Sequence, residues 1–271
     1  MSAEHATRTI QRAVVFTHDR ADETAVGIEK LSAAARKAGV ELLFDTEEKA
    51  VDVCIVLGGD GTTLRALRAH AGTEVPVFAI NFGKIGFLAT IDREELEEGI
   101  ERVLTGRFDV LKLPSLLLDG GSPELFAINE VSFQRRPHLN MAQISYSLAG
   151  EEVARVPCDG LIAATAAGST GYNLSVGGPI LAWGVRGFTV SLIAPHALSA
   201  RALVAAPEDV LVVTNDGYDP LDIVVDGMRT GELGANKSAE IVFRPDVVGL
   251  AQIPGTTFYR RFREKLLQLT Q

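Results

Sequence analysis

The stretch VDVCIVLGGDGT, residues 51–62, decides the fold of the first part of this chain. From Val51 to Leu57 it is nearly all apolar and rich in β-branched side chains, which is typical of a central parallel strand covered on both faces. A glycine-rich turn follows, and from Thr62 onward Leu64 and Leu67 recur on one side of a predicted helix. A buried strand that passes through glycines into a helix indicates an open α/β sheet.

The segments on either side repeat this alternation of strand and helix. Further strands are predicted by apolar runs at residues 13–16, 40–44 and 75–81, and further helices by apolar periodicity at residues 28–38 and 96–104. Asp92 and Glu95, just before the second of these helices, have the spacing of a capping box. We therefore expect an N-terminal α/β domain over residues 1–110, with a doubly wound, mostly parallel sheet.

The pattern changes near Leu111. From there the apolar runs are short and often alternate with polar residues, as in the segment 143–148, and glycine, proline or aspartate bounds them. This pattern predicts antiparallel structure, and so a β-rich domain over residues 111–250. In the last segment, residues 251–271, Phe258 and Phe262 are spaced by four, which favours a C-terminal helix.

Composition narrows the possible partners. The 26 lysines and arginines against 35 aspartates and glutamates give a formal net charge of −9, which would repel duplex nucleic acid and anionic membranes. The two cysteines form no CxxC pattern, so no zinc site or disulfide framework is predicted. The first residues contain no apolar signal-peptide core, and no run reaches the roughly 18 apolar residues of a membrane span. We expect a cytoplasmic enzyme with neither nucleic acid nor membrane as partner.

The turn from Gly58 to Gly61 is the sharpest chemical signal. Backbone N–H groups at the start of a helix favour an anion, and glycines let a phosphate approach closely. The turn lacks the lysine of a P-loop, and Leu64 stands where a dinucleotide fingerprint needs its third glycine. Asp60 in its middle would repel a phosphate unless it holds Mg²⁺ or accepts a proton from a hydroxyl nucleophile. The alternative is an ordinary strand-to-helix turn in which Asp60 is a helix cap.

Two later motifs suit a nucleotide. The pair Asn129 and Glu130 combines an amide and a carboxylate, which can hold vicinal ribose hydroxyls, although a polar pair at a strand edge is the alternative. The stretch from Asp159 to Pro179 is rich in glycine and hydroxyl residues and contains one tyrosine, Tyr172. Such a stretch suits a flat heterocycle and its sugar. The alternative is a glycine-rich connection between strands.

Taken together, these three motifs resemble the ATP-NAD kinase family, and the resemblance runs from about residue 10 to 267. The glycine–aspartate turn alone is shared with diacylglycerol and sphingosine kinases and with phosphofructokinases. The resemblance implies an α/β domain, a β-rich domain and a C-terminal helix that returns to the first domain. It also implies NAD and ATP (or polyphosphate) as substrates, NADP as product, Mg²⁺ or another divalent cation, and a homodimer or homotetramer.

The resemblance also implies roles for individual residues. Asp60 would be the catalytic carboxylate, and the donor phosphates would meet Gly58, Gly59, Gly61 and Thr62. NAD would be bound by Asp60, Gly61, Arg65, Asn129, Glu130, Asp159, Thr170, Gly171, Tyr172, Asn173, Leu174, Ser175 and Ala194. No side chain is assigned as a metal ligand. This chain departs from the family's usual sequence at Ala166 and Ala167, at Gly171, where alanine is usual, and at Met228.

The expected function is therefore phosphoryl transfer to the 2′-hydroxyl of the adenosine ribose of NAD. A lipid kinase of the same superfamily is one alternative, and the motifs from Asp159 to Pro179 argue against it. A regulatory protein that binds NAD(P) without catalysis is another, and the presence of Asp60, Asn129 and Glu130 argues against that.

Overall fold

The computed structural model describes residues 8–17, 21–44, 46, 48–83, 86–119, 125–197 and 199–265. The chain divides into two compact units, residues 1–112 together with 247–271, and residues 113–246. Strands β6 (Asp109–Asp119) and β17 (Ser238–Gln252) each begin in one unit and end in the other. Among the described residues, no helix combines the length and the apolar character needed to cross a membrane.

The first unit is built on a parallel sheet in the order β2-β1-β3-β4, and both β5 and β17 pair in parallel with β4. The central strand β3 is buried along its whole length, as its apolar sequence predicts. The strands are β1 (Arg12–Thr17), β2 (Glu41–Phe44), β3 (Val53–Gly58), β4 (Pro76–Asn81) and β5 (Ile91–Asp92). The helices are α1 (Ala21–Ala38), α2 (Asp60–Ala69), the short 3-10 helix η1 (Arg93–Glu95), α3 (Leu96–Leu104) and α5 (Phe258–Lys265).

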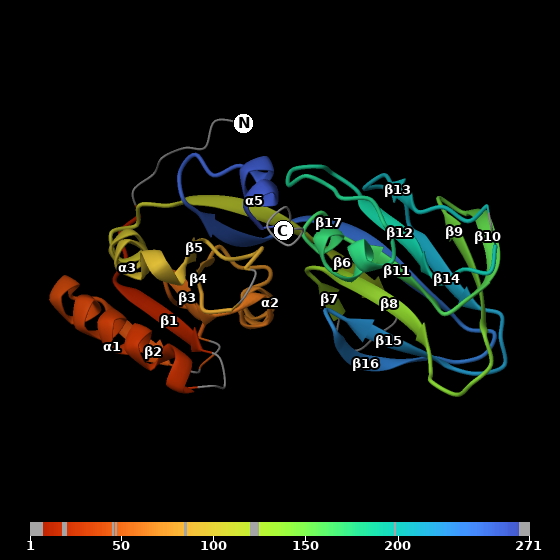
Figure 1. The fold of residues 1–271 in the computed structure, drawn as a ribbon, viewed down its shortest axis with the longest axis horizontal. Helices are drawn as coiled ribbons and strands as arrows, with labels where there is room; N and C mark the ends of the chain where they lie inside the picture. The colour runs from red at the N-terminus through yellow and green to blue at the C-terminus, as the bar shows by residue number, and fades with distance from the viewer. Residues whose placement is uncertain are drawn as a thin grey trace. The chain divides into compact units, whose positions relative to one another are not determined.

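Helices cover both faces of this sheet. Alternate strand residues, such as Val15 and Ile55, share one hydrophobic cluster with Leu31 of α1 and Val103 of α3. Helix α2 packs on the other face, where its Ala66 and Leu67 are fully buried (Figure 1). The doubly wound sheet expected from the sequence is confirmed. The C-terminal helix α5 belongs to this unit, as the resemblance implied.

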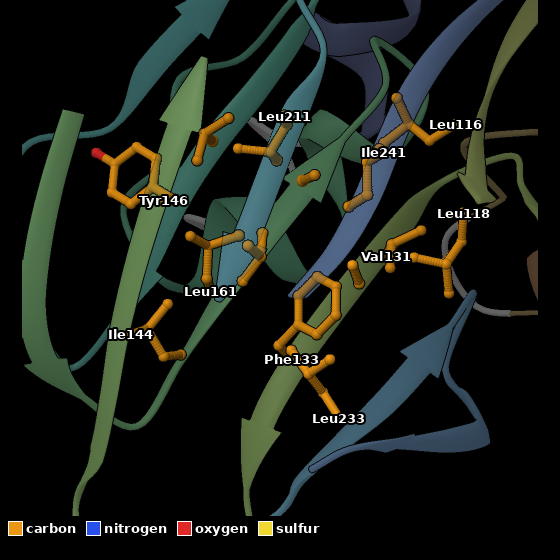
Figure 2. Close-up of a cluster of buried hydrophobic side chains, with 14 of the residues drawn as sticks. Leu116, Leu118, Val131, Phe133, Ile144, Tyr146, Leu161, Leu211, Leu233 and Ile241 are labelled. Carbon is orange, nitrogen blue, oxygen red and sulfur yellow. The ribbon is translucent and has the colours of Figure 1, made fainter. Parts of the chain in front are cut away.

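The second unit is a sandwich of antiparallel sheets. One sheet has six strands in the order β13-β12-β11-β8-β15-β16, and the other contains β10-β9-β14-β17. Figure 2 shows the core between them, where Phe133 and Leu161 of the first sheet belong to one cluster with Ile144 and Leu211 of the second. The β-rich C-terminal domain is therefore confirmed.

The remaining elements all lie in this second unit. They are β7 (Leu125–Ala127), β8 (Glu130–Arg135), β9 (Ala142–Leu148), β10 (Glu151–Cys158), β11 (Gly160–Ala164), η2 (Gly168–Thr170), α4 (Tyr172–Ser175), β12 (Phe188–Ile193), β13 (Leu203–Ala205), β14 (Leu211–Asn215), β15 (Leu221–Val225) and β16 (Met228–Leu233).

Candidate active site

The turn after β3 holds Asp60 in a fixed orientation. Gly59 is the N-cap of α2, and Asp60 is the first residue of that helix rather than its cap. One carboxylate oxygen of Asp60 accepts the backbone N–H of Phe87 at 2.9 Å, and the other accepts that of Leu88 at 3.0 Å. The alternative interpretation, in which Asp60 is the cap of this helix, is therefore wrong. Because a carboxylate oxygen has two lone pairs, each oxygen keeps one for a substrate.

The glycines of this turn are needed where backbone segments approach one another. A Cβ atom on Gly58 would lie 2.7 Å from Oγ1 of Thr62, and one on Gly83 would lie 3.1 Å from the Cα of Gly59. Gly61 faces open space and is exposed. The first turn of α2 thus presents backbone N–H groups on an uncluttered surface, which is an arrangement that binds phosphates.

Arg65 lies on α2, one turn beyond the glycines. Its guanidinium donates to the backbone carbonyl of Thr17 at 2.8 Å and lies 5.4 Å from the centre of the Phe16 ring. The end of β1 is adjacent to the end of β3, because Thr17 pairs with Leu57. Arg65 and Asp60 are therefore both placed at the carboxyl edge of the parallel sheet, where ligands bind in open α/β folds.

A second group of predicted residues is assembled in the second unit, at the start of β8. Backbone N–H groups of Ile128, Asn129 and Glu130 donate to the carboxylate of Asp226 at 3.0, 2.7 and 3.2 Å. Asp226 and Gly227 connect β15 to β16 and have φ angles of 47° and 79°, as a two-residue hairpin turn requires. This role of Asp226 was not predicted from the sequence. The Asp-Gly pair between two strands was the available signal.

Glu130 is buried in an unusual electrostatic setting. Its side chain is only 8 % exposed, and burial, with a further contribution from the charge of Asp226, raises the pKa of its carboxyl group to about 7. Within the described ranges, Oε2 of Glu130 and Oδ1 of Asn129 are buried and have no hydrogen-bond partner. Buried polar atoms are normally satisfied, so these two indicate a ligand that supplies donors.

The segment after β11 passes close to the same two side chains. Strand β11 runs antiparallel to β8, with Ala164 paired to Glu130, so the chain beyond Ala164 returns beside Asn129. A Cβ atom on Gly168 would lie 2.1 Å from the carbonyl oxygen of Asn129, and one on Gly171 would lie 3.3 Å from Oε2 of Glu130. The structure thus brings Asn129, Glu130 and Gly171 together. Thr170 directly precedes Gly171 in the chain.

The neighbouring predicted residues differ in what they offer to a ligand. The amide of Asn173 is fully buried, accepts from the hydroxyls of Thr189 and Ser191 and donates to two carbonyls, so this side chain fixes the loop. Tyr172 is 37 % exposed, Ser175 is exposed and Leu174 is half-buried. These three side chains have accessible surface for a ligand.

Asp159 and Ala194 lie at the other end of β11. The backbone N–H of Asp159 donates to Ile193, which directly precedes Ala194, and the Asp159 carboxylate pairs with Arg135 at 2.7 Å. The five residues of β11 separate this pair from Glu130 and Gly171, a span of about 17 Å at the rise of an extended strand. A ligand that contacted both groups would have to span about this distance.

The described residues offer little for a resident metal ion. Within them, no group of three or more histidine, cysteine, aspartate or glutamate side chains has the geometry to hold one. Asp60 is a single carboxylate, and each of its oxygens has one lone pair left after accepting a backbone N–H. A divalent cation at this site would therefore depend mainly on oxygens brought by the substrates.

Comparisons with known proteins agree with this geometry. Residues 6–108 match the family model described as the ATP-NAD kinase N-terminal domain, and residues 128–245 match that of the ATP-NAD kinase C-terminal domain. The chain is 34 % identical over 228 residues to the NAD kinase of Gemmatimonas aurantiaca, covering 82 % of this chain and 79 % of that protein. It is also 34 % identical over 221 residues to the NAD kinase of Methanopyrus kandleri, covering 81 % and 79 % of the two chains.

Solved structures give the same result. An NAD kinase from Archaeoglobus fulgidus in complex with ATP superposes with a TM-score of 0.79 at 25 % identity, covering 96 % of this chain and 99 % of the other. Yeast NADH kinase complexed with NADH superposes with a TM-score of 0.83 at 21 % identity, covering 97 % and 89 %, which demonstrates a shared fold. On the strength of both family models and of these relatives, the chain belongs to the ATP-NAD kinase family.

Proposed function

We propose that this protein is an NAD kinase, which transfers the terminal phosphoryl group of ATP to the 2′-hydroxyl of the adenosine ribose of NAD and so produces NADP. The observation that carries the proposal is the placement of Asp60. Its carboxylate lies at the start of α2, in the glycine-rich turn at the carboxyl edge of the sheet. Two backbone N–H groups fix its orientation. The relatives named NAD kinase at 34 % identity support this assignment.

In the proposed mechanism, Asp60 accepts the proton of the ribose hydroxyl as that oxygen bonds to the terminal phosphorus of ATP. The bond from this phosphorus to the bridging oxygen breaks, and ADP leaves with that oxygen. A positioned general base contributes about 10²–10⁴-fold to such a step. The donor phosphates are bound by backbone N–H groups at the start of α2. These groups belong to the segment that contains Gly58, Gly59, Gly61 and Thr62. Arg65, held at the same edge of the sheet, adds a positive charge beside the reacting groups.

Asn129 and Glu130 bind the adenosine ribose of NAD. Their unpartnered oxygens accept hydrogen bonds from ribose hydroxyls, and those bonds satisfy atoms that would otherwise stay buried without a partner. Thr170, Gly171, Tyr172, Leu174 and Ser175 form the adjoining wall, and Asn173 keeps that wall in shape. Asp159 and Ala194, at the far end of β11, contact the nicotinamide portion.

The donor would enter as its complex with a divalent cation, since the described residues provide no cluster of side chains that could hold the ion by themselves. In P-loop proteins a lysine offsets part of the negative charge of the phosphates. This turn has no such lysine, so the positive charge of the cation would take over that task. Excess chelator should therefore abolish turnover with ATP, and added Mg²⁺ should restore it. Full turnover in chelator would contradict this part of the proposal.

One assay tests the whole assignment. The purified protein is incubated with Mg²⁺, NAD and either ATP or polyphosphate, and NADP is measured with an NADP-specific dehydrogenase. Formation of NADP with at least one donor is the expected result, and ATP is expected because the Archaeoglobus fulgidus relative was solved with it. Binding of NAD without turnover would favour a regulatory protein, and phosphorylation of diacylglycerol in its place would favour a lipid kinase.

The active form is proposed to be a homodimer or homotetramer, with NAD bound near a contact between copies. Light scattering at micromolar concentration should then give a multiple of 29.0 kDa. A mass of 29.0 kDa from a fully active sample would contradict the proposed assembly.

A further inference from the structure

Helix α5 buries an arginine in the first unit. The side chain of Arg261 is only 7 % exposed, although arginine is among the residues that are least often buried. Its guanidinium donates to the backbone carbonyl of Ala89, and more distantly to those of Phe87 at 3.4 Å and Thr90 at 3.5 Å. It also reaches Oε1 of Gln252 at 3.4 Å. Arg261 therefore binds a short run of carbonyl groups on one segment.

That segment is the one that orients Asp60. Residues 86–90 lie outside any helix or strand, so no regular ladder fixes their backbone. The N–H groups of Phe87 and Leu88 donate to the Asp60 carboxylate, while the carbonyls of Phe87 and Ala89 accept from Arg261. The segment is thus held by Asp60 through its N–H groups and by Arg261 through its carbonyls.

Further contacts fix the two ends of this arrangement. The hydroxyl of Thr90 accepts the N–H of Ala79 at 3.0 Å and donates to the carbonyl of Ala251 at 2.8 Å, so the segment is attached to the sheet where it ends. On α5, one turn beyond Arg261, Lys265 contacts both oxygens of Asp92 at 2.7 Å. The helix is therefore attached to the unit independently of Arg261.

The charge of Arg261 is placed where it can act on Asp60. Burial lowers the pKa of the guanidinium, and the nearby carboxylates of Asp92 and Asp60 act in the opposite direction. Arginine keeps its charge under such burial, and its planar group can bind several carbonyls at once. A lysine at this position would keep the charge and lose most of the carbonyl contacts.

We propose that Arg261 is a positioning residue for phosphoryl transfer, which holds residues 87–90 so that the N–H groups of Phe87 and Leu88 keep the Asp60 carboxylate aimed at the acceptor hydroxyl. This inference rests on the proposed function, because it assigns a role in that reaction. It differs from a purely structural role in one respect: removal of Arg261 should act on the rate through Asp60.

The kinetic test uses the neighbouring arginine as a matched control. Arg260 lies on the same helix, is exposed and pairs with Glu264. Arg261→Met should lower kcat by up to about 100-fold, the cost of a small misplacement at an active site, with little change in the KM for NAD. Arg261→Lys should recover part of the loss, and Arg260→Met should behave as the wild type. Equal kcat values for Arg260→Met and Arg261→Met would overturn the proposal.

A double-mutant cycle shows whether the effect passes through Asp60. In an Asp60→Asn background, Arg261→Met should change the residual kcat little, because the group that it positions has already been removed. A full additional loss in that background would indicate a merely structural role and would overturn the proposal. Should Arg261→Met fail to fold, Arg261→Lys takes its place in both backgrounds, and the same non-additive outcome is required.

Hydrogen exchange separates this inference from the proposed function. The amides of Phe87 and Leu88 should exchange faster in Arg261→Met than in the wild type or in Arg260→Met, since the segment loses its carbonyl contacts. Unchanged exchange would overturn the positioning role even in an active enzyme. If the wild type forms no NADP, the proposed function fails, and the assignment of Arg261 to that reaction fails with it. The exchange result then decides only whether Arg261 holds the segment.

Discussion

Each unit contains one carboxyl group that the proposed function assigns a role, and the two groups are held in opposite ways. Asp60 is half-buried, and each of its oxygens accepts a backbone N–H. Glu130 is 8 % exposed, lies beside the negative charge of Asp226, and in the described part of the chain has an oxygen that no group satisfies. This difference fits the proposed roles, because the reaction step would use a carboxylate that is already oriented, whereas a bound ligand would supply the hydrogen bond that Glu130 lacks.

The strongest way to break this comparison is Asp60→Asn. We expect kcat to fall by about 10²–10⁴-fold, because asparagine has neither the charge nor the proton-accepting oxygen of a general base. The amide also accepts only one of the two N–H groups, so we expect a loss of about 1–2 kcal/mol in the free energy of unfolding. NAD affinity should change little. Turnover, melting temperature and NAD binding are measured on one preparation.

Asp52→Asn is a matched control for this variant. Asp52 lies before β3 and Asp60 after it, and the Asp52 carboxylate also accepts two backbone N–H groups, from Gln11 at 2.7 Å and Arg12 at 2.9 Å. Both of these bonds go to one oxygen, which asparagine retains. Turnover should therefore stay at the wild-type level in Asp52→Asn. A folded, NAD-binding Asp60→Asn protein that keeps more than about a tenth of its rate would show that Asp60 is not the base.

The second prediction concerns the pH dependence of stability in the free protein. The pKa of Glu130 is about 7 in the folded state against a usual value of 4.5, so the folded protein binds this proton more tightly than the unfolded chain does. The stabilisation is complete below pH 4.5 and is lost as the pH rises from 4.5 through 7. The expected loss from this group is about 3 kcal/mol.

Glu130→Gln removes this titration and keeps the size of the side chain. Denaturant unfolding should show that the free energy of unfolding falls less between pH 5 and pH 8 in Glu130→Gln than in the wild type. Glu240→Gln, a change of an exposed glutamate on β17, should follow the wild type. If the free energy of unfolding changes equally with pH in Glu130→Gln and in the wild type, Glu130 is ionised in the folded protein at the same pH as in the unfolded chain.

The third prediction tests whether the second site binds NAD. Glu130→Ala should weaken NAD binding by about tenfold, the value of one good hydrogen bond, and should alter kcat much less. Calorimetric titration with NAD measures the affinity, and Glu240→Ala is the control. A loss in kcat at unchanged affinity would place Glu130 in the reaction step, and the contrast drawn between the two carboxyl groups would then be incorrect.

Sequence patterns predicted the parts of this molecule that depend on local periodicity. Strand β3 is buried as its apolar run requires, and the alternating segment at 143–148 lies in the antiparallel strand β9. The resemblance supplied the site residues, and the structure shows that Asn129, Glu130 and Gly171 meet although they are far apart in the chain.

The partners of the polar side chains could not be predicted in this way. Asp92 is the N-cap residue of η1, as the capping-box spacing predicts. Its carboxylate, however, accepts from Asn81 and Lys265 and makes no cap hydrogen bond, so the predicted capping bond is not formed. Asp226 is separated from Glu130 by 96 residues, and Arg261 from Ala89 by 172. Contacts at such separations are set by sheet pairing and by the return of the chain, which a local pattern does not contain.

The smallest expected effect sharpens the comparison at the second site. Gly171 stands where the family usually has alanine, and its φ of −91° is negative, so it does not have the left-handed conformation that favours glycine. A Cβ atom there would lie 3.3 Å from Oε2 of Glu130, a side chain that can move by a few tenths of an ångström. Gly171→Ala should therefore cost less than about 1 kcal/mol of stability and change NAD affinity only a few-fold.

Gly168→Ala is the contrasting variant, since its Cβ would lie 2.1 Å from the backbone carbonyl of Asn129, which cannot move without shifting β8. It should cost well over 1 kcal/mol in thermal unfolding and weaken NAD binding more than Gly171→Ala. Equal effects of the two alanines would mean that Glu130 is as rigid as the backbone beneath it, and the incomplete, adaptable character assigned to this site would be disproved.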